Sequence, residues 1–232
     1  MNPYMTIGFQ TAEPLWAHDE DDQLTERVVL RRVLEVLNLV ELGDADLRRF
    51  QKPGQFSVGE DQRVLIAMAL VTLPTLMIAD EPTTALDVMV QAQLLDLLQN
   101  LQRRLGLSII LVTHDLGVVA EICDEVLVMY AGRVVEYGSV EVIFNNPRHP
   151  YTQRLLQAFP DVANPRMTLT SIPGYPPPLA AMPPGCRFEP RCLCSAPVCT
   201  DKSPRLVRIE PGHFVACHRV RGTSYGTEST IE

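Results

Sequence analysis

The chain has 232 residues, of which 46% are hydrophobic, and a formal net charge of −8. This length allows one hydrophobic core, or one core with a small appendage. No apolar run approaches the roughly 20 residues that cross a bilayer, and the N-terminus lacks a secretory pattern, so we expect a cytoplasmic protein. The acidic balance argues against a general nucleic-acid-binding protein, which would usually be basic.

The first third of the sequence is predicted to be mainly helical. The opening stretch, residues 1–15, is interrupted by proline and glycine and leads into an acidic run at 19–22. Apolar residues then recur at helical spacing from Leu24 to Leu42, and Gly43 ends the pattern. Ser57 is a suitable N-cap for a second helix from about Gly59 to Val71.

After Pro74 short apolar runs alternate with helical patterns. This alternation predicts a parallel α/β core with right-handed crossovers, followed by an antiparallel hairpin. The predicted strands are 75–79, 108–113, 125–130 and 133–137, and the predicted helices are 88–105, capped by Asp87, and a short one ending at Cys123.

From Asn146 onward proline becomes frequent and long periodic segments stop, with six prolines between Pro173 and Pro184. We therefore expect an irregular C-terminal extension. The sequence as a whole is divided into a helical part (1–73), an α/β core (74–145) and this extension (146–232).

The strongest chemical signal is the segment Leu76–Asp87, LMIADEPTTALD. The apolar strand places Asp80 at its carboxyl end, where open α/β sheets bind ligands, and a carboxylate there can hold Mg²⁺. The adjacent Glu81 can orient or deprotonate a water aimed at a γ-phosphate. The alternative is an acidic turn that caps a helix, but the full twelve-residue string favours the catalytic interpretation.

This segment resembles the ABC ATPase family, which implies a partial P-loop NTPase fold that uses ATP and Mg²⁺. Asp80 is similar to the family's Walker B aspartate and Glu81 to its catalytic glutamate. Residues 85–87 resemble the D-loop, in which Asp87 would help to bind the nucleotide. His114 follows the next strand in LVTHD and is similar to the switch histidine, a γ-phosphate contact.

The segment 56–63, FSVGEDQR, stands where the family places its signature motif, commonly Leu-Ser-Gly-Gly-Gln. A helix N-terminus favours anions there, and the resemblance implies that Ser57 and Gly59 meet the γ-phosphate held by the opposite subunit. Val58, however, replaces a glycine, and the carboxylates at 60 and 61 would repel ATP. A role of Ser57 as a helix cap alone therefore remains open.

The flanking sequences indicate the subfamily. Residues 2–15, HPYT at 149–152, and GCRFEPRC at 185–192 resemble the ATP-binding subunits of oligopeptide and dipeptide ABC importers. The resemblance runs from Asn2 to about Val220. It implies a second ABC ATPase subunit, two membrane permease subunits and, indirectly, a solute-binding protein. It also implies a peripheral position on the cytoplasmic face of the bacterial inner membrane, where ATP hydrolysis would energise import of peptides or of related solutes such as nickel.

No Gly-x-x-x-x-Gly-Lys-[Ser/Thr] occurs in the sequence, so it contains no Walker A loop. In the resembled fold that loop's strand lies between the strands ending at Thr113 and starting at Glu125. We expect its absence to leave an unpaired edge and an uncovered apolar face, and the chain alone to bind ATP weakly. A truncated, frameshifted or split gene would give such a sequence.

Cysteine is unevenly distributed, with five of six residues between 186 and 217. Cys186, Cys192, Cys199 and Cys217 have the spacing C-x5-C-x6-C-x17-C, and four thiolates can hold a [4Fe–4S] cluster or zinc. The resembled importer subunits favour the iron–sulfur cluster, while zinc and free thiols remain alternatives. Cys194 is interpreted as a bystander.

Three rival functions are compatible with parts of the sequence. The first is a non-catalytic partner subunit, favoured by Val58 and the missing Walker A loop. The second is a soluble ABC ATPase of DNA repair or translation, which the HPYT and cysteine features disfavour. The third is a metal-binding module joined to a relic α/β part.

Overall fold

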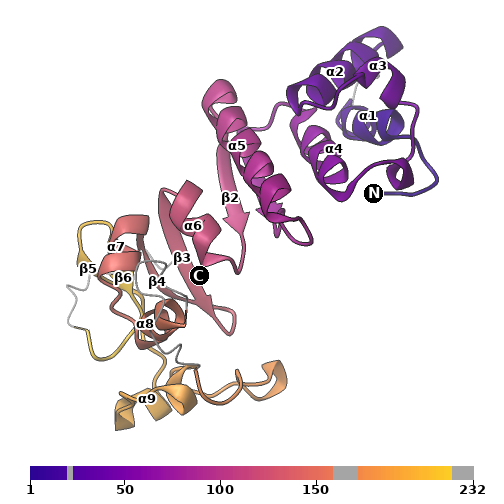
Figure 1. The fold of residues 1–232 in the computed structure, drawn as a ribbon. Helices are drawn as coiled ribbons and strands as arrows, with labels where there is room; N and C mark the ends of the chain where they lie inside the picture. The colour runs from indigo at the N-terminus through magenta and orange to yellow at the C-terminus, as the bar shows by residue number, and fades with distance from the viewer. Residues whose placement is uncertain (20–22, 159–171, 221–232) are drawn as a thin grey trace. The chain divides into compact units, whose positions relative to one another are not determined.

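The computed structural model describes residues 1–19, 23–158 and 172–220. The chain forms two compact units, Met1–His114 and Asp115–Glu232 (Figure 1). Each unit has its own cluster of buried apolar side chains. None of the helices in the described ranges is long and apolar enough to span a membrane.

The N-terminal unit begins with helices that pack together. They are α1 (Ile7–Ala17), α2 (Glu26–Leu39), α3 (Ala45–Arg48), the 3₁₀ turn η1 (Pro53–Gln55) and α4 (Val58–Leu70). The predictions of α2 and α4 are confirmed, and Ser57 is the N-cap of α4.

Helix α1 was not predicted, because the proline and glycine of the opening stretch suggested a loop. Thr6 caps this helix, and Pro14 lies inside it. Gly8 allows the helix to approach the chain at Arg49, since a Cβ on Gly8 would fall 2.8 Å from the Arg49 carbonyl oxygen. Burial of Ile7 and Ala12 in the core then stabilises the helix despite the missing N–H of proline.

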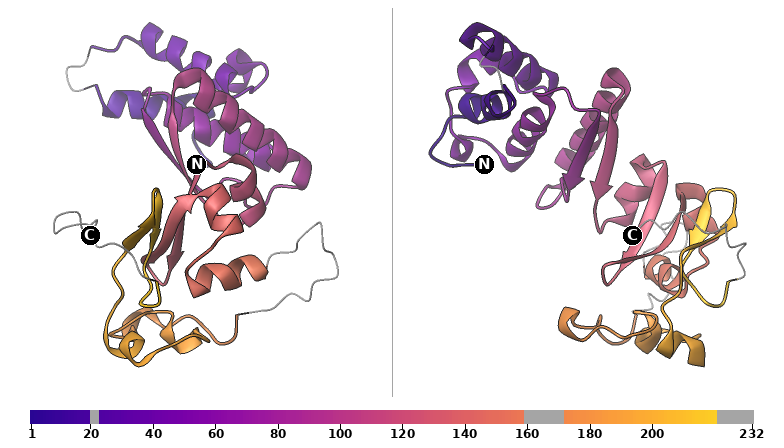
Figure 2. Two further views of the ribbon diagram at one scale, coloured as in Figure 1. Left: turned by 90° about the vertical axis from the view of Figure 1, so that its left-hand side faces the viewer. Right: turned by 180° about the vertical axis from the view of Figure 1, so that it is seen from behind.

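The remainder of this unit is one parallel strand pair with a crossover helix. Strand β1 (Leu76–Asp80) pairs with β2 (Ser108–Val112), residue for residue. Helix α5 (Val88–Leu105) joins them, capped by Asp87 and ended by Gly106 in the left-handed conformation, as predicted. It packs on one face of the strand pair (Figure 2). Its leucines share a core with Met77 there.

The other face of the strand pair is apolar and uncovered. Its side chains are 46–66% exposed: Leu76, Ile78, Ile110 and Val112. In the part of the chain that the structure describes, β2 pairs only with β1, so its second edge is open. Among the residues that the structure describes, the unpaired edge and the uncovered face therefore agree with the expectation from the sequence.

The C-terminal unit is built on an antiparallel sheet of order β3-β4-β6-β5. Its elements are α6 (Leu116–Ile122), β3 (Glu125–Tyr130), β4 (Arg133–Ser139), α7 (Val140–Asn145), α8 (Pro150–Gln157), η2 (Leu179–Ala181), η3 (Glu189–Arg191), α9 (Pro197–Asp201), β5 (Val207–Glu210) and β6 (His213–Val215).

Strand β3 does not continue the parallel sheet in the described residues, which differs from the predicted alternation. It pairs instead with β4, through a turn in which Ala131 and Gly132 both have positive φ. Two such residues form the tight turn that matches the twist of a hairpin, so the local pairing is strongly favoured.

The C-terminal extension is more ordered than its composition indicated. Strands β5 and β6 form a hairpin that adds to the free edge of β4. The aromatic ring of Phe214 lies 5.8 Å from that of Tyr137, and Phe188 is fully buried against Tyr130 and Tyr151. Long-range packing therefore organises a segment that has no periodic pattern of its own.

Candidate functional site

The candidate site begins where β1 ends. Asp80 is the last strand residue and is exposed. Glu81 follows with φ of +48°, and its backbone N–H donates to the Val112 carbonyl of β2 at 2.8 Å. A positive φ is unusual for a residue with a side chain and indicates that the surroundings determine its conformation.

His114 meets Glu81 at this end of the sheet. Its Nδ1 donates to Oε1 of Glu81 at 2.7 Å, and the histidine side chain is 83% exposed. The contact with His114 is the main reason why the pKa of Glu81 lies below its ordinary value. The carboxylate therefore stays ionised, as a general base must. Because β1 and β2 are parallel, their carboxyl ends bring together two residues that are 33 positions apart.

Thr84 is a third residue in this group, and it is not among the site residues predicted from the sequence. Its hydroxyl donates to Oε2 of Glu81 at 3.2 Å. The signal that could have found it is the spacing Glu-Pro-x-Thr, because a turn started by proline returns the chain toward its first residue.

Asp87 and Ser57 act as helix caps in this structure. Asp87 Oδ1 accepts the backbone N–H groups of Met89 and Val90, both at 3.0 Å. Ser57 Oγ accepts the backbone N–H of Glu60, while Glu60 Oε2 accepts from the backbone N–H and the hydroxyl of Ser57. This reciprocal arrangement is a capping box, and the Ser57 N–H bond is the main reason why the pKa of Glu60 is lowered.

Gly59 has a packing role in addition to its predicted phosphate role. A Cβ at this position would lie 2.5 Å from Cγ1 of Val90 on α5. Glycine is therefore what allows α4 to pack closely on α5. Of the predicted site residues, the structure brings Glu81 and His114 into contact beside Asp80, and uses Ser57, Gly59 and Asp87 at helix ends.

Comparisons with known proteins match an N-terminal segment and a C-terminal segment of the chain. A family model described as "ABC transporter" matches residues 5–84, and one described as "Oligopeptide/dipeptide transporter, C-terminal region" matches residues 135–199. The chain is 45% identical over 219 residues to the oligopeptide transport ATP-binding protein OppD of Salmonella typhimurium, which covers 94% of this chain and 64% of that protein. It is 46% identical over 217 residues to OppD of Haemophilus influenzae, covering 94% and 66%.

The chain belongs to the ABC transporter ATP-binding family. A solved structure agrees: CbiO1 of Clostridium perfringens, part of the ABC transporter complex CbiONQ, matches with a TM-score of 0.53 and 30% identity. That match covers 61% of this chain and 54% of CbiO1. The family fold implies ATP and Mg²⁺ as ligands. The chain spans 64–66% of the length of curated relatives such as these OppD proteins.

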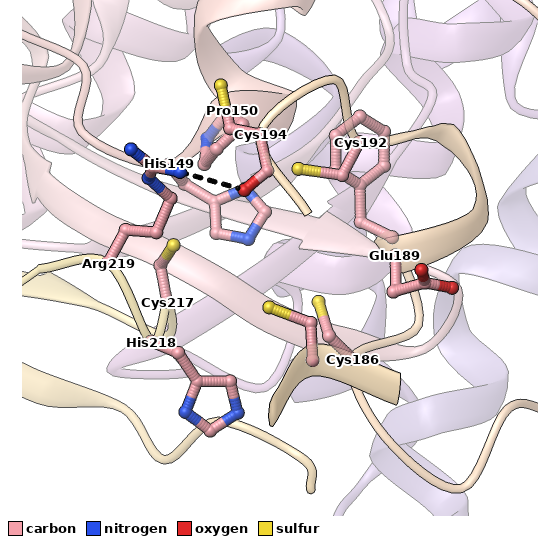
Figure 3. A pocket seen from close by; sticks show the side chains of 11 residues that line it. His149, Pro150, Cys186, Glu189, Cys192, Cys194, Cys217, His218 and Arg219 are labelled. Carbon is pink, nitrogen blue, oxygen red and sulfur yellow. Dashed lines mark hydrogen bonds between the residues drawn. The ribbon is translucent and has the colours of Figure 1, made fainter. Parts of the chain in front are cut away.

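Five of the six cysteines of this ABC family member lie around one pocket of the C-terminal unit (Figure 3). All five cysteines from 186 to 217 line it, together with His149, His218 and Phe188. Burial raises the pKa of the Cys186, Cys192 and Cys217 thiols, which favours their protonated form.

The metal centre expected from the cysteine spacing is not supported by this geometry. Within the described ranges, no three or more His, Cys, Asp or Glu side chains are grouped so that they could hold a metal ion. The sequence pattern correctly indicated that these cysteines gather, but spacing along an irregular segment does not determine how the thiols are oriented.

Glu136, a fully buried carboxylate beside this pocket's His149, was not predicted from the sequence. It accepts the backbone N–H groups of Arg148 and His149 at 2.6 and 3.0 Å, and Nε2–H of His213 at 2.8 Å. Glu136 thus joins β4, the start of α8 and β6. Its signal in the sequence was a single acid within an apolar strand, VVEY.

Proposed function

We propose that this chain is part of an ATP-binding subunit whose ATP hydrolysis energises import of peptides, or of related solutes such as nickel, by an ABC transporter. The observation that carries the proposal is the Glu81–His114 contact at the carboxyl ends of β1 and β2. The names of its relatives, which are oligopeptide transport ATP-binding proteins, support the same class of solute.

In this mechanism each residue of the site has one task. Asp80 would hold Mg²⁺, since a carboxylate at this strand end suits that ion, and the ion would supply positive charge beside the phosphates. Glu81 orients and deprotonates the attacking water, and His114 contacts the γ-phosphate. Ser57 and Gly59 face the nucleotide of the opposite ATPase subunit, and Asp87 contributes through the D-loop.

The partners follow from the same proposal. A second ABC ATPase subunit closes the nucleotide site, and two permease subunits receive the movement, with a solute-binding protein acting on the far side. The protein would then be peripheral on the cytoplasmic face of the bacterial inner membrane. The helical part (1–73) faces the permease, the α/β part (74–145) carries the chemistry, and the extension (146–232) is an additional module.

The test is ATP turnover by the assembled transporter. We expect Glu81→Gln to lower kcat at least 100-fold while ATP binding persists, because the amide cannot accept a proton. Glu121→Gln, an exposed glutamate on α6, is the matched control and should leave kcat unchanged. Normal turnover by Glu81→Gln would refute the catalytic assignment.

A non-catalytic partner subunit is the second candidate, favoured by the Ser57–Glu60 contact. The Glu60 carboxylate takes up the N–H and hydroxyl that would otherwise meet a phosphate, and Oε1 of the same carboxylate pairs with Arg48 at 2.7 Å. If this candidate is correct, the reconstituted subunit pair hydrolyses ATP at only one of its two sites. Two equivalent sites would exclude it.

We also propose, from the cysteine spacing, that the pocket binds a [4Fe–4S] cluster or zinc once the thiols reorient and ionise. Cys186, Cys192, Cys199 and Cys217 are the proposed ligands. Anaerobically purified protein should contain iron and inorganic sulfide, or one zinc per chain. The variant Cys186→Ser should lack the metal that the wild type contains. Protein that contains neither and has free thiols would refute the proposal.

A further inference from the structure

The turn that follows β1 returns the chain toward Glu81. The backbone N–H of Thr84 donates to the Glu81 carbonyl at 3.2 Å, which closes a four-residue turn. Pro82 and Thr83, its central residues, are buried, whereas Thr84 is exposed. The turn therefore fixes the backbone of Thr84 close to that of Glu81 without burying the Thr84 side chain.

The two oxygens of the Glu81 carboxylate have separate partners. His114 Nδ1 donates to Oε1 at 2.7 Å and the Thr84 hydroxyl donates to Oε2 at 3.2 Å. A carboxylate held at both oxygens cannot rotate about its last torsion without losing one bond, and that torsion is otherwise soft. Its orientation is therefore set from two sides before any substrate is bound.

We propose that Thr84 is a positioning residue for Glu81, whose hydroxyl fixes the plane of the carboxylate so that a free lone pair faces the attacking water. This inference rests on the proposed function, in which Glu81 is the general base. Thr84 touches neither substrate nor metal in it and acts only through Glu81. The bond is longer than the usual 2.7–2.8 Å of such pairs, as catalytic hydrogen bonds often are before substrate binds.

A purely structural role for Thr84 predicts something different. Its side chain is exposed, so its methyl group contributes little to the core, and the turn is closed by its backbone N–H. Thr84→Val keeps the shape and the backbone bond and removes only the hydroxyl. Thr84→Ser keeps the hydroxyl and removes the methyl group. Comparing these two variants therefore distinguishes an effect on the orientation of Glu81 from an effect on the stability of the turn.

In the assembled transporter we expect Thr84→Val to lower kcat for ATP hydrolysis about three- to tenfold, as for one net hydrogen bond, with KM changed much less. Thr84→Ser should restore kcat. This separation of kcat from KM, together with rescue by Thr84→Ser, is a result that loss of turn stability alone would not produce.

Wild-type kcat in Thr84→Val, with Glu81→Gln inactive, would overturn this inference and leave the proposed function intact. Normal turnover by Glu81→Gln would instead refute the proposed function, independently of the Thr84 variants. Should Thr84→Val unfold, Thr84→Ala replaces it, and kcat of that folded variant compared with Thr84→Ser gives the same decision.

Discussion

The buried carboxylate of Glu136 offers the sharpest test of how the C-terminal unit is held together. It is 0% exposed, and His213, its side-chain partner, is 1% exposed. Three donors from two other segments converge on it, at 2.6, 3.0 and 2.8 Å. Nδ1 of His213 is itself buried without a hydrogen-bond partner in the part of the chain that the structure describes. The bond to Glu136 is therefore the one hydrogen bond that the described residues provide to this ring.

We predict that Glu136→Gln destabilises this unit by about 2–4 kcal/mol. An amide keeps one acceptor oxygen but turns its NH₂ toward a donor, which leaves at least one buried N–H unpaired, at a cost of about 1–3 kcal/mol. The loss of charge adds to this, because hydrogen bonds to charged groups contribute about 1.5–3 kcal/mol each, more than those to a neutral amide oxygen.

Native-state amide hydrogen exchange measures this effect within each unit separately. The expected destabilisation corresponds to exchange about 30- to 900-fold faster in β4, α8 and β6. Amides of α2, α4 and α5 serve as the internal reference, and Glu141→Gln, an exposed glutamate on α7, is the control variant. Exchange within threefold of wild type in Glu136→Gln would show that the cluster contributes no net stability, contrary to this reasoning.

Two further predictions concern single contacts. Burial lowers the pKa of His149 from 6.5 to about 4. As the pH falls, the unfolded chain therefore binds a proton at this residue before the folded chain does. The free energy of unfolding should decrease by about 2 kcal/mol from pH 7 to pH 5. The variant His149→Asn keeps an N-cap acceptor for the Tyr151 N–H but cannot be protonated in this range. In urea unfolding, its free energy of unfolding should decrease less between pH 7 and pH 5 than that of the wild type. An equal decrease would show that His149 is not the group responsible. Gly59→Ala should destabilise the N-terminal unit by about 1–3 kcal/mol through its clash with Val90. Val90→Ala should recover most of that in the double variant, and additive losses would show that the clash is not the cause.

Local sequence patterns predicted much of the fold. The helices now assigned as α2, α4 and α5, and strands β1, β2 and β3, were predicted within a few residues. Each has a strong period or a clear cap, such as Asp87 and Gly106 at the two ends of α5. Helix α1 and the β5–β6 hairpin were missed because burial and long-range pairing, not local preference, stabilise them.

The candidate site was predicted from the sequence in its residue types but not in its contacts. The LMIADEPTTALD string placed Asp80 and Glu81 after a buried strand, and LVTHD placed His114 after the next one. That the two strands are parallel neighbours is what brings His114 within 2.7 Å of Glu81. Thr84 entered the site through a turn geometry that its residue type does not reveal.

The sequence by itself therefore determined the chemistry available to this protein: two acids and a histidine at strand ends, a modified signature segment and a group of cysteines. Only the tertiary structure decided what these groups do to one another, including the Ser57–Glu60 capping box, the Glu136 cluster and the arrangement of the thiols. The physical reason is that hydrophobic periods and caps act over a few residues along the chain. Hydrogen bonds and metal coordination, in contrast, depend on angstrom-scale distances between segments that only packing brings together.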